Sequence, residues 1–121
     1  MSKSNNFLII KSKSSGAELA SNCAHANSAF ARLIGLLNHS TLENGTGLLL
    51  DPCNQVHTFF MRFPIDAVFL NRDNKVIAIR ELQPWKMTKM YFKAKKTLEL
   101  PLGTCRRLGV HVGELLEVTP C

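Results

Sequence analysis

The chain has 121 residues, of which 45% are hydrophobic and 20% are charged, and its formal net charge is +6. This length suits one domain with a substantial core, and no run approaches the roughly 18 apolar residues of a membrane-spanning helix. Residues 62–107 hold eleven Lys and Arg against four Asp and Glu. Such a basic region can attract nucleic acid, acidic lipid or an acidic protein, and it equally suits a solvated face.

The first part of the chain predicts two strands and one helix. Phe7–Lys11 is apolar enough for a short strand, and Ala17–Ala26 mixes small and polar residues as an edge strand does. A helix is predicted over Ser28–Leu37, because its apolar residues repeat at the spacing of one helical face. These residues are Phe30, Leu33, Ile34 and Leu37.

The densest run of aromatic and branched residues follows at 57–70. It predicts two strands, His57–Phe63 and Ile65–Leu70, because such side chains suit a pleated surface. Pro64 lies between them and marks a bend, because it has no N–H to give to a sheet. Both faces of the second strand are apolar, which indicates burial on both sides. Asp66 is therefore expected among apolar neighbours, where a carboxylate must be hydrogen-bonded or paired.

The polar turn Asn71–Lys75 and the apolar run Val76–Leu82 complete a predicted hairpin from Ile65 to Leu82. Further short strands are predicted at Gly47–Leu50, Thr97–Leu102 and Leu115–Val118, with a long loop at Gln83–Lys96 and one turn, helical or not, at Gly103–Gly109. Many short strands with one short helix near residues 28–37 predict a single mainly-β domain over residues 1–121. Its architecture is expected to be a small β-sandwich or an open β-barrel.

Several segments from Arg32 onward resemble a known family, domain-of-unknown-function family 192. They are Arg32-Leu33-Ile34-Gly35-Leu36, Gly47-Leu48-Leu49-Leu50, the run from His57 to Asp66, the run from Leu98 to Gly103, and Gly113-Glu114. The resemblance covers about residues 30–118 and implies a mainly-β domain with one helix and no established activity. Family members commonly have Gly-Asp where this chain has Gly113-Glu114. The resemblance also implies a link to secretion or pilus-assembly machinery, because genes of family members often lie near genes of those systems.

Location and metal binding follow from the N-terminus and the cysteines. Phe7–Ile10 is too short for a signal-peptide core, so a cytoplasmic protein is expected, unlike the many exported members of the family. In a reducing compartment the four cysteines should be free thiols. Cys23 with His25 and Cys53 with His57 offer four zinc ligands, but their spacing is poor for a zinc finger. No metal and no other cofactor is therefore predicted.

Acid–base catalysis is one alternative. His57, Asp66 and Glu99 can converge if the central strands neighbour Thr97–Leu102, and His57 titrates near neutrality as a general acid or base does. The structural alternative is that Asp66 accepts backbone N–H bonds at the bend of Pro64 while His57 packs beside Met61. No sequence motif of a named enzyme class supports the catalytic reading, so no catalytic residue is assigned.

Binding is the preferred alternative. Residues 85–96 combine three aromatic residues with five lysines, which can stack on bases and meet phosphate, or can cap the core and face water. Nucleic acid is not the expected partner. We predict instead a small ligand- or protein-binding β-domain, monomeric or weakly dimeric, with Gln83–Lys96 as a mobile rim. The candidate ligand-binding residues are His57, Met61, Asp66, Trp85 and Glu99.

Overall fold

The computed structural model describes residues 7–26 and 43–120, so the helix predicted over Ser28–Leu37 lies outside the described residues. The strands are β1 (Phe7–Ser12), β2 (Glu18–Ala26), β3 (Thr46–Leu50), β4 (Ile65–Leu70), β5 (Val76–Leu82), β6 (Lys96–Pro101) and β7 (Leu116–Pro120). Within the described ranges one short helix, α2 (Thr104–Leu108), connects β6 to β7, and no helix is long and apolar enough to cross a membrane.

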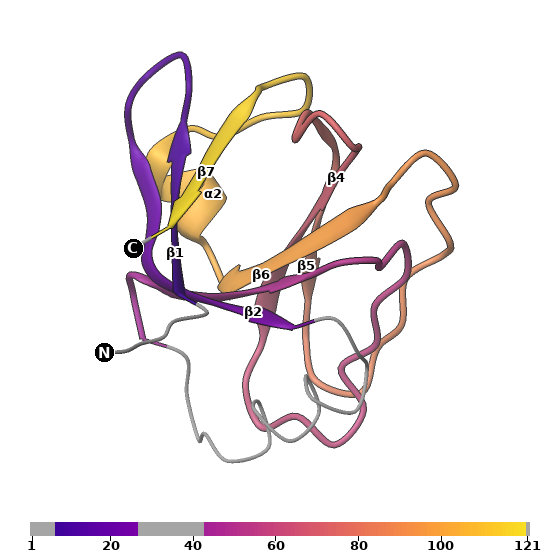
Figure 1. Ribbon diagram of the computed structural model, residues 1–121. Coiled ribbons are helices and arrows are strands. Elements are labelled where there is room, and N and C mark those ends of the chain that lie inside the picture. Colours follow the sequence, from indigo (N-terminus) through magenta and orange to yellow (C-terminus); the bar gives the residue numbers. More distant parts are fainter. Residues whose placement is uncertain (1–6, 27–42, 121) are drawn as a thin grey trace.

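All seven strands belong to one sheet with the order β5-β4-β6-β3-β2-β1-β7. Neighbouring strands are antiparallel except β2 and β3, which run parallel. The sheet curls strongly, so that its two edge strands approach each other (Figure 1). The prediction of a mainly-β domain is confirmed, and its form is the open barrel rather than the sandwich.

The curl closes at one end of the seam between β5 and β7. The N–H of Val76 donates to the carbonyl of Glu114 at 2.8 Å, and the N–H of Gly113 donates to the carbonyl of Val76 at 2.8 Å. One step further, the N–H of Leu116 donates to the carbonyl of Asn74 at 2.9 Å. These bonds join the start of β7 to the start of β5. Among the described residues, the remainder of β5 pairs on one side only, with β4.

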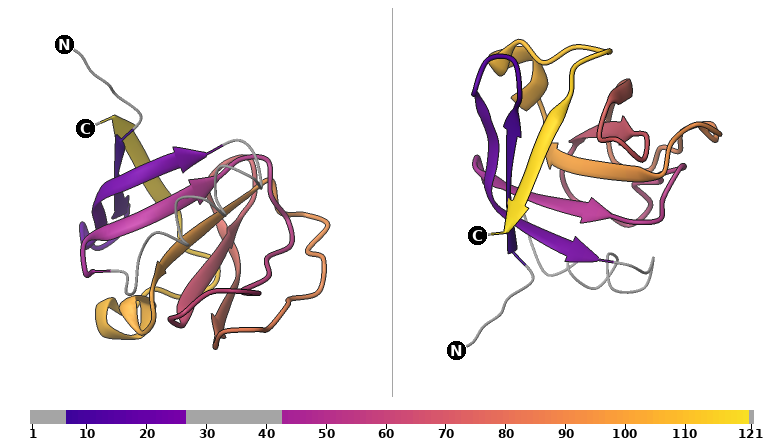
Figure 2. Two further views of the ribbon diagram at one scale, coloured as in Figure 1. Left: turned by 90° about the horizontal axis from the view of Figure 1, so that it is seen from below. Right: turned by 45° about the horizontal axis from the view of Figure 1, so that its top comes forward.

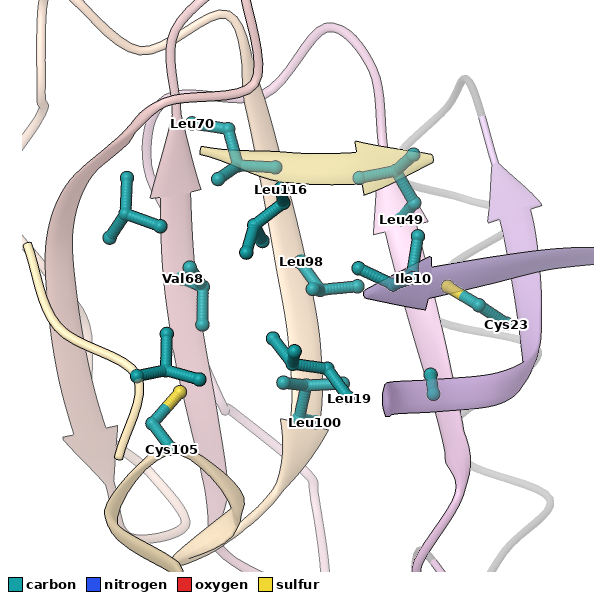
Figure 3. Close-up of a cluster of buried hydrophobic side chains, with 13 residues drawn as sticks. Ile10, Leu19, Cys23, Leu49, Val68, Leu70, Leu98, Leu100, Cys105 and Leu116 are labelled. Carbon is teal, nitrogen blue, oxygen red and sulfur yellow. The ribbon is translucent and has the colours of Figure 1, made fainter. Parts of the chain in front are cut away.

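Two apolar clusters occupy the two faces of the sheet. The first lies inside the curl and receives buried side chains from all seven strands and from α2 (Figure 3). The second lies on the opposite face, where Ile65, Ala67 and Phe69 of β4 meet Leu48 and Leu50 of β3. Since side chains alternate along a strand, β4 supplies both clusters and is buried on both faces, as its sequence predicts.

The hairpin from Ile65 to Leu82 is confirmed as β4 and β5, but two other strand predictions are wrong. β2 is not an edge strand, because it lies between β1 and β3. The segment His57–Phe63 is not a strand of the sheet. It makes one isolated bridge, from His57 to Met87, and then turns at Phe59 and Phe60. This segment instead crosses over one face of the sheet, where its residues Met61 and Phe63 pack in the second cluster.

Candidate functional site

The five residues predicted to bind a ligand do not surround one pocket. Asp66 and Glu99 are both 0% exposed. Asp66 pairs with Leu100 across β4 and β6, whereas Glu99 pairs with Ala67, one position along. Because successive residues of a strand point to opposite faces, the two carboxylates lie on opposite faces of the sheet. The convergence expected for an acid–base centre is not found.

Asp66 has a structural role at the start of α2. Its Oδ1 accepts the N–H of Gly103 at 3.0 Å, and its Oδ2 accepts the N–H of Cys105 at 3.0 Å. The structural alternative correctly expected backbone N–H donors, but these donors belong to the first turn of α2 and not to the bend of Pro64. A carboxylate from β4 thus satisfies N–H groups that a short helix leaves without helical partners.

Met61 and Glu99 are both parts of the second face. Met61 is 5% exposed and belongs to the second apolar cluster. Glu99 stands beside Leu48 and Ala67, its register partners in β3 and β4. The side chains of these two predicted site residues are therefore enclosed by the fold. Met61 belongs to the same region of the molecule as His57 and Trp85, but it lies on the inner side of that region.

That region consists of residues 53–63 and 83–95, which we call the arm. Its two segments run side by side along one flank of the barrel (Figures 1 and 2). The side chains of Val56, Met61 and Phe63 turn inward from the arm to complete the second cluster. The arm therefore has an inner surface fixed by apolar packing and an outer surface facing solvent.

Thr58 joins the two segments near the end of the arm. Its hydroxyl donates to the carbonyl of Gln83 at 2.7 Å and accepts the N–H of Lys86 at 2.8 Å. Its backbone N–H donates to the carbonyl of Lys86 at 2.8 Å, and its carbonyl accepts the N–H of Trp85 at 2.9 Å. One buried threonine thus forms hydrogen bonds with three residues of the opposite segment.

Thr88 also joins the two segments by hydrogen bonds, in the middle of the arm. Its N–H donates to the carbonyl of Val56 at 2.9 Å, and its hydroxyl accepts the N–H of Val56 at 3.1 Å. Further along, the N–H of Tyr91 donates to the carbonyl of Asn54 at 2.8 Å. The long loop predicted over Gln83–Lys96 is therefore hydrogen-bonded at intervals to the segment before β4.

The end of the arm carries an exposed aromatic pair, Phe60 and Trp85. Their ring centroids are 4.7 Å apart, and the two residues are 61% and 58% exposed. Their φ angles are 69° and 66°, values that are uncommon for residues other than glycine. Phe59 lies 6.2 Å from Trp85 and 4.9 Å from His57 between ring centroids. The His57 ring is therefore stacked on Phe59.

The remaining outer surface of the arm is apolar and basic. The nine exposed large hydrophobic residues of the described ranges include five from the arm. These five are Phe60, Trp85, Met87, Met90 and Phe92. The arm also contains one arginine and four lysines and no Asp or Glu. The arm thus holds more than half of these exposed hydrophobic residues, and a concentration of exposed apolar side chains is typical of an interaction site.

Some of these cations have partners within the fold. Lys95 pairs with Asp51 at 2.6 Å, and the Lys89 ammonium lies 5.2 Å from the centroid of the Tyr91 ring. Across residues 7–26 and 43–120, no carboxylate pairs with Arg62, Lys86 or Lys93. The charge of these three side chains is available to a partner.

The cysteines do not form a metal site in the described part of the chain, where no three His, Cys, Asp or Glu side chains gather. Burial raises the pKa of the Cys23 thiol to about 12. Burial, together with the nearby Asp66 carboxylate, raises the pKa of the Cys105 thiol to about 12 as well. Both thiols are thus held in the protonated form, which is a poor ligand and nucleophile. Cys53 instead borders a cavity of about 420 Å³ at the base of the arm, beside Lys95.

Sequence reasoning identified Trp85 and its lysines but missed Phe60 and Thr58, which it placed in a strand. One signal could have found the arm. Residues 52–65 and 82–98 contain no Asp or Glu. They also precede and follow the two strands of the predicted hairpin, so they are expected to be close in space. Two segments that both lack acidic residues and flank one hairpin indicate a common surface.

Comparison with known proteins adds a family and a fold. The profile of domain-of-unknown-function family 192 (DUF192), described as Uncharacterized ACR, matches residues 10–118. UPF0127 proteins of Pyrococcus furiosus and Pyrococcus abyssi are 40% and 36% identical over 62 residues, which are 51% of this chain and 53% of each relative. The matched part of the chain thus spans about half the length of these relatives.

Two solved structures are similar in fold. One is a putative transcription regulator from Sinorhizobium meliloti, with a TM-score of 0.77 and 22% identity over 96% of this chain and 98% of that chain. The other is a protein of unknown function from Novosphingobium aromaticivorans, with a TM-score of 0.76 and 19% identity over 92% of this chain and 83% of that chain. At these identities the likeness concerns the fold alone.

Proposed function

This chain belongs to domain-of-unknown-function family 192, and we propose that it is a small binding domain that engages an acidic partner through the arm. The observation that carries the proposal is the exposed pair of Phe60 and Trp85, held by hydrogen bonds on a surface without carboxylates. Binding is favoured over catalysis because Asp66 and Glu99 are enclosed on opposite faces of the sheet.

The backbone of the pair supports this proposal. Two non-glycine residues with positive φ angles store strain of roughly 1 kcal/mol or more each, which persists where the surrounding structure imposes it. For Trp85, the bonds of Thr58 to Gln83, Trp85 and Lys86 supply this constraint. If a partner covered about 200 Å² of the two rings, this burial would contribute roughly 5 kcal/mol to the binding free energy before the cost of association is subtracted.

Trp85 offers a direct test, because it is the single tryptophan of the chain. Its fluorescence can be followed while the protein is titrated with poly-L-glutamate, with a single-stranded oligonucleotide, with phosphatidylserine vesicles, and with poly-L-lysine. We expect a saturable change with at least one anionic probe, weakened by added salt, and none with poly-L-lysine.

Charge variants make the test specific to the arm. Replacing Lys86 and Lys93 with Gln should weaken binding of the anionic probe by about tenfold or more. Replacing Arg72 and Lys75 in the exposed β4–β5 turn removes the same charge elsewhere and should leave binding nearly unchanged. Equal losses in the two double variants, or no response to any anionic probe, would refute the proposed function.

A further inference from the structure

We propose that the acidic partner of the arm is the surface of an anionic lipid bilayer, an inference that rests on the proposed function of the arm. The first reason is that its apolar side chains project outward. Phe60 and Trp85 are 61% and 58% exposed, Met87, which bridges to His57, is 58% exposed, and Phe92 is 84% exposed. Projecting apolar groups can enter a bilayer interface, where Trp is enriched.

The second reason is the type and position of the cations. Lys86 and Lys93 follow Trp85 and Phe92 directly in the sequence, so each of these two exposed rings has a lysine as its neighbour along the chain. Lysine is a flexible point charge, whereas the rigid fork of arginine is favoured for base and protein recognition. Lysine is also depleted in protein interfaces. A fluid layer of anionic headgroups is the partner that suits lysines placed in this way.

The third reason is that the aromatic pair is poorly suited to nucleic acid. The rings of Phe60 and Trp85 meet at an interplanar angle of 59°, so they form no parallel slot into which a base could stack. Met87 and Met90 are exposed within the same surface and offer no aromatic face. Base stacking on successive planar side chains is the usual basis of single-strand binding, and this surface does not provide it.

The test uses vesicles of phosphatidylserine and phosphatidylcholine in equal amounts, with vesicles of phosphatidylcholine alone as the reference. We expect the protein to sediment with the mixed vesicles and not with the reference. The Trp85 emission should shift to shorter wavelength and be quenched by lipids brominated in their acyl chains, because the indole enters the bilayer. Added salt should release the protein.

A variant that removes the ring without disturbing the backbone sharpens the test. Phe60→Asn suits this position because Asn tolerates a positive φ, and we expect it to lower partitioning onto mixed vesicles by about tenfold. Phe92→Ser, at the other end of the arm, should lower it as well. Val112→Ser is the matched control, because Val112 is 57% exposed and lies between α2 and β7. This control should partition as the unaltered protein does.

The outcomes separate the two proposals. If poly-L-glutamate or the oligonucleotide binds through the arm while mixed vesicles do not, the lipid inference is wrong and the proposed function stands. If soluble glycerophosphoserine binds as tightly as vesicles and bromolipids do not quench Trp85, the arm recognises a headgroup and not a bilayer surface, which also overturns the inference. If no anionic probe binds, both proposals are wrong.

Discussion

At the scale of single residues, Asp66 is the clearest case of a buried charge with a structural task. Its two oxygens accept the N–H groups of Gly103 and Cys105. In Asp66→Asn one acceptor becomes an N–H₂ donor that faces another donor. We expect this change to lower the free energy of unfolding by about 2 kcal/mol, measured by urea denaturation. Asp73→Asn, in the exposed turn after β4, is the control, and equal stability of both variants would contradict the assigned role.

Glu114 is a second buried carboxylate, and it joins the β1–β2 turn to the start of β7. It accepts the hydroxyl of Ser12 and, at 2.8 Å, the N–H of His111. Burial by itself acts to raise the pKa of the Glu114 carboxyl, but these hydrogen bonds and the charge of His111 outweigh it. The pKa of Glu114 in the folded protein therefore lies below its usual value.

The lowered pKa predicts a pH-dependent contribution to stability. A group with a lower pKa in the folded state stabilises the fold fully above its unfolded pKa, about 4.3 for Glu, and loses this contribution as the pH falls through the folded pKa. We expect Glu114→Gln to be less stable than the unaltered protein at neutral pH, by about 1 kcal/mol. The difference should shrink once the pH falls below about 4.3.

Urea denaturation at a series of pH values from neutral to acid measures this difference directly. Glu117→Gln provides a matched control, because Glu117 is exposed on the neighbouring β7. A difference between Glu114→Gln and the unaltered protein that stays constant down to the acid limit would mean that the Glu114 charge contributes nothing.

At the scale of elements, the arm depends on one hydroxyl group. Thr58 is 0% exposed, and its hydroxyl serves both the carbonyl of Gln83 and the N–H of Lys86. Thr58→Val keeps the shape of the side chain but leaves these two backbone groups without that partner. We expect it to lower the free energy of unfolding by about 2 kcal/mol, with Thr119→Val on the exposed face of β7 as control. A loss below the error of the measurement would show that water replaces the hydroxyl.

At the scale of the whole molecule, the seam between β5 and β7 decides whether the curled sheet behaves as one cooperative unit. The N–H groups of Val76, Gly113 and Leu116 all donate across this seam. We expect their hydrogen exchange to be as slow as that of β4, because opening them would uncurl the sheet around its core. Amide exchange followed by NMR measures this. Exchange at these three amides as fast as at an exposed turn would show that the seam opens independently.

The sequence by itself determined the local elements of this protein. The hairpin of β4 and β5 follows from two apolar runs joined by a polar turn, and the burial of β4 on both faces follows from its unbroken apolar pattern. The helical turn after Gly103 is confirmed as well. Each of these features depends on residues close together in the chain, so a local pattern is sufficient to indicate it.

Only the tertiary structure decided which segments are neighbours. An apolar pattern shows that a strand is buried but not which strand lies beside it, so the interior place of β2 and the parallel pairing of β2 with β3 had no local signal. For the same reason His57–Phe63 looked like a strand, although its hydrogen-bond partners are in residues 83–88. The opposite orientation of Asp66 and Glu99 depends on the register between β4 and β6. Register is set by packing between distant residues, so the sequence indicated Trp85 and its lysines, whereas their pairing with Phe60 and Thr58 became visible only in the folded chain.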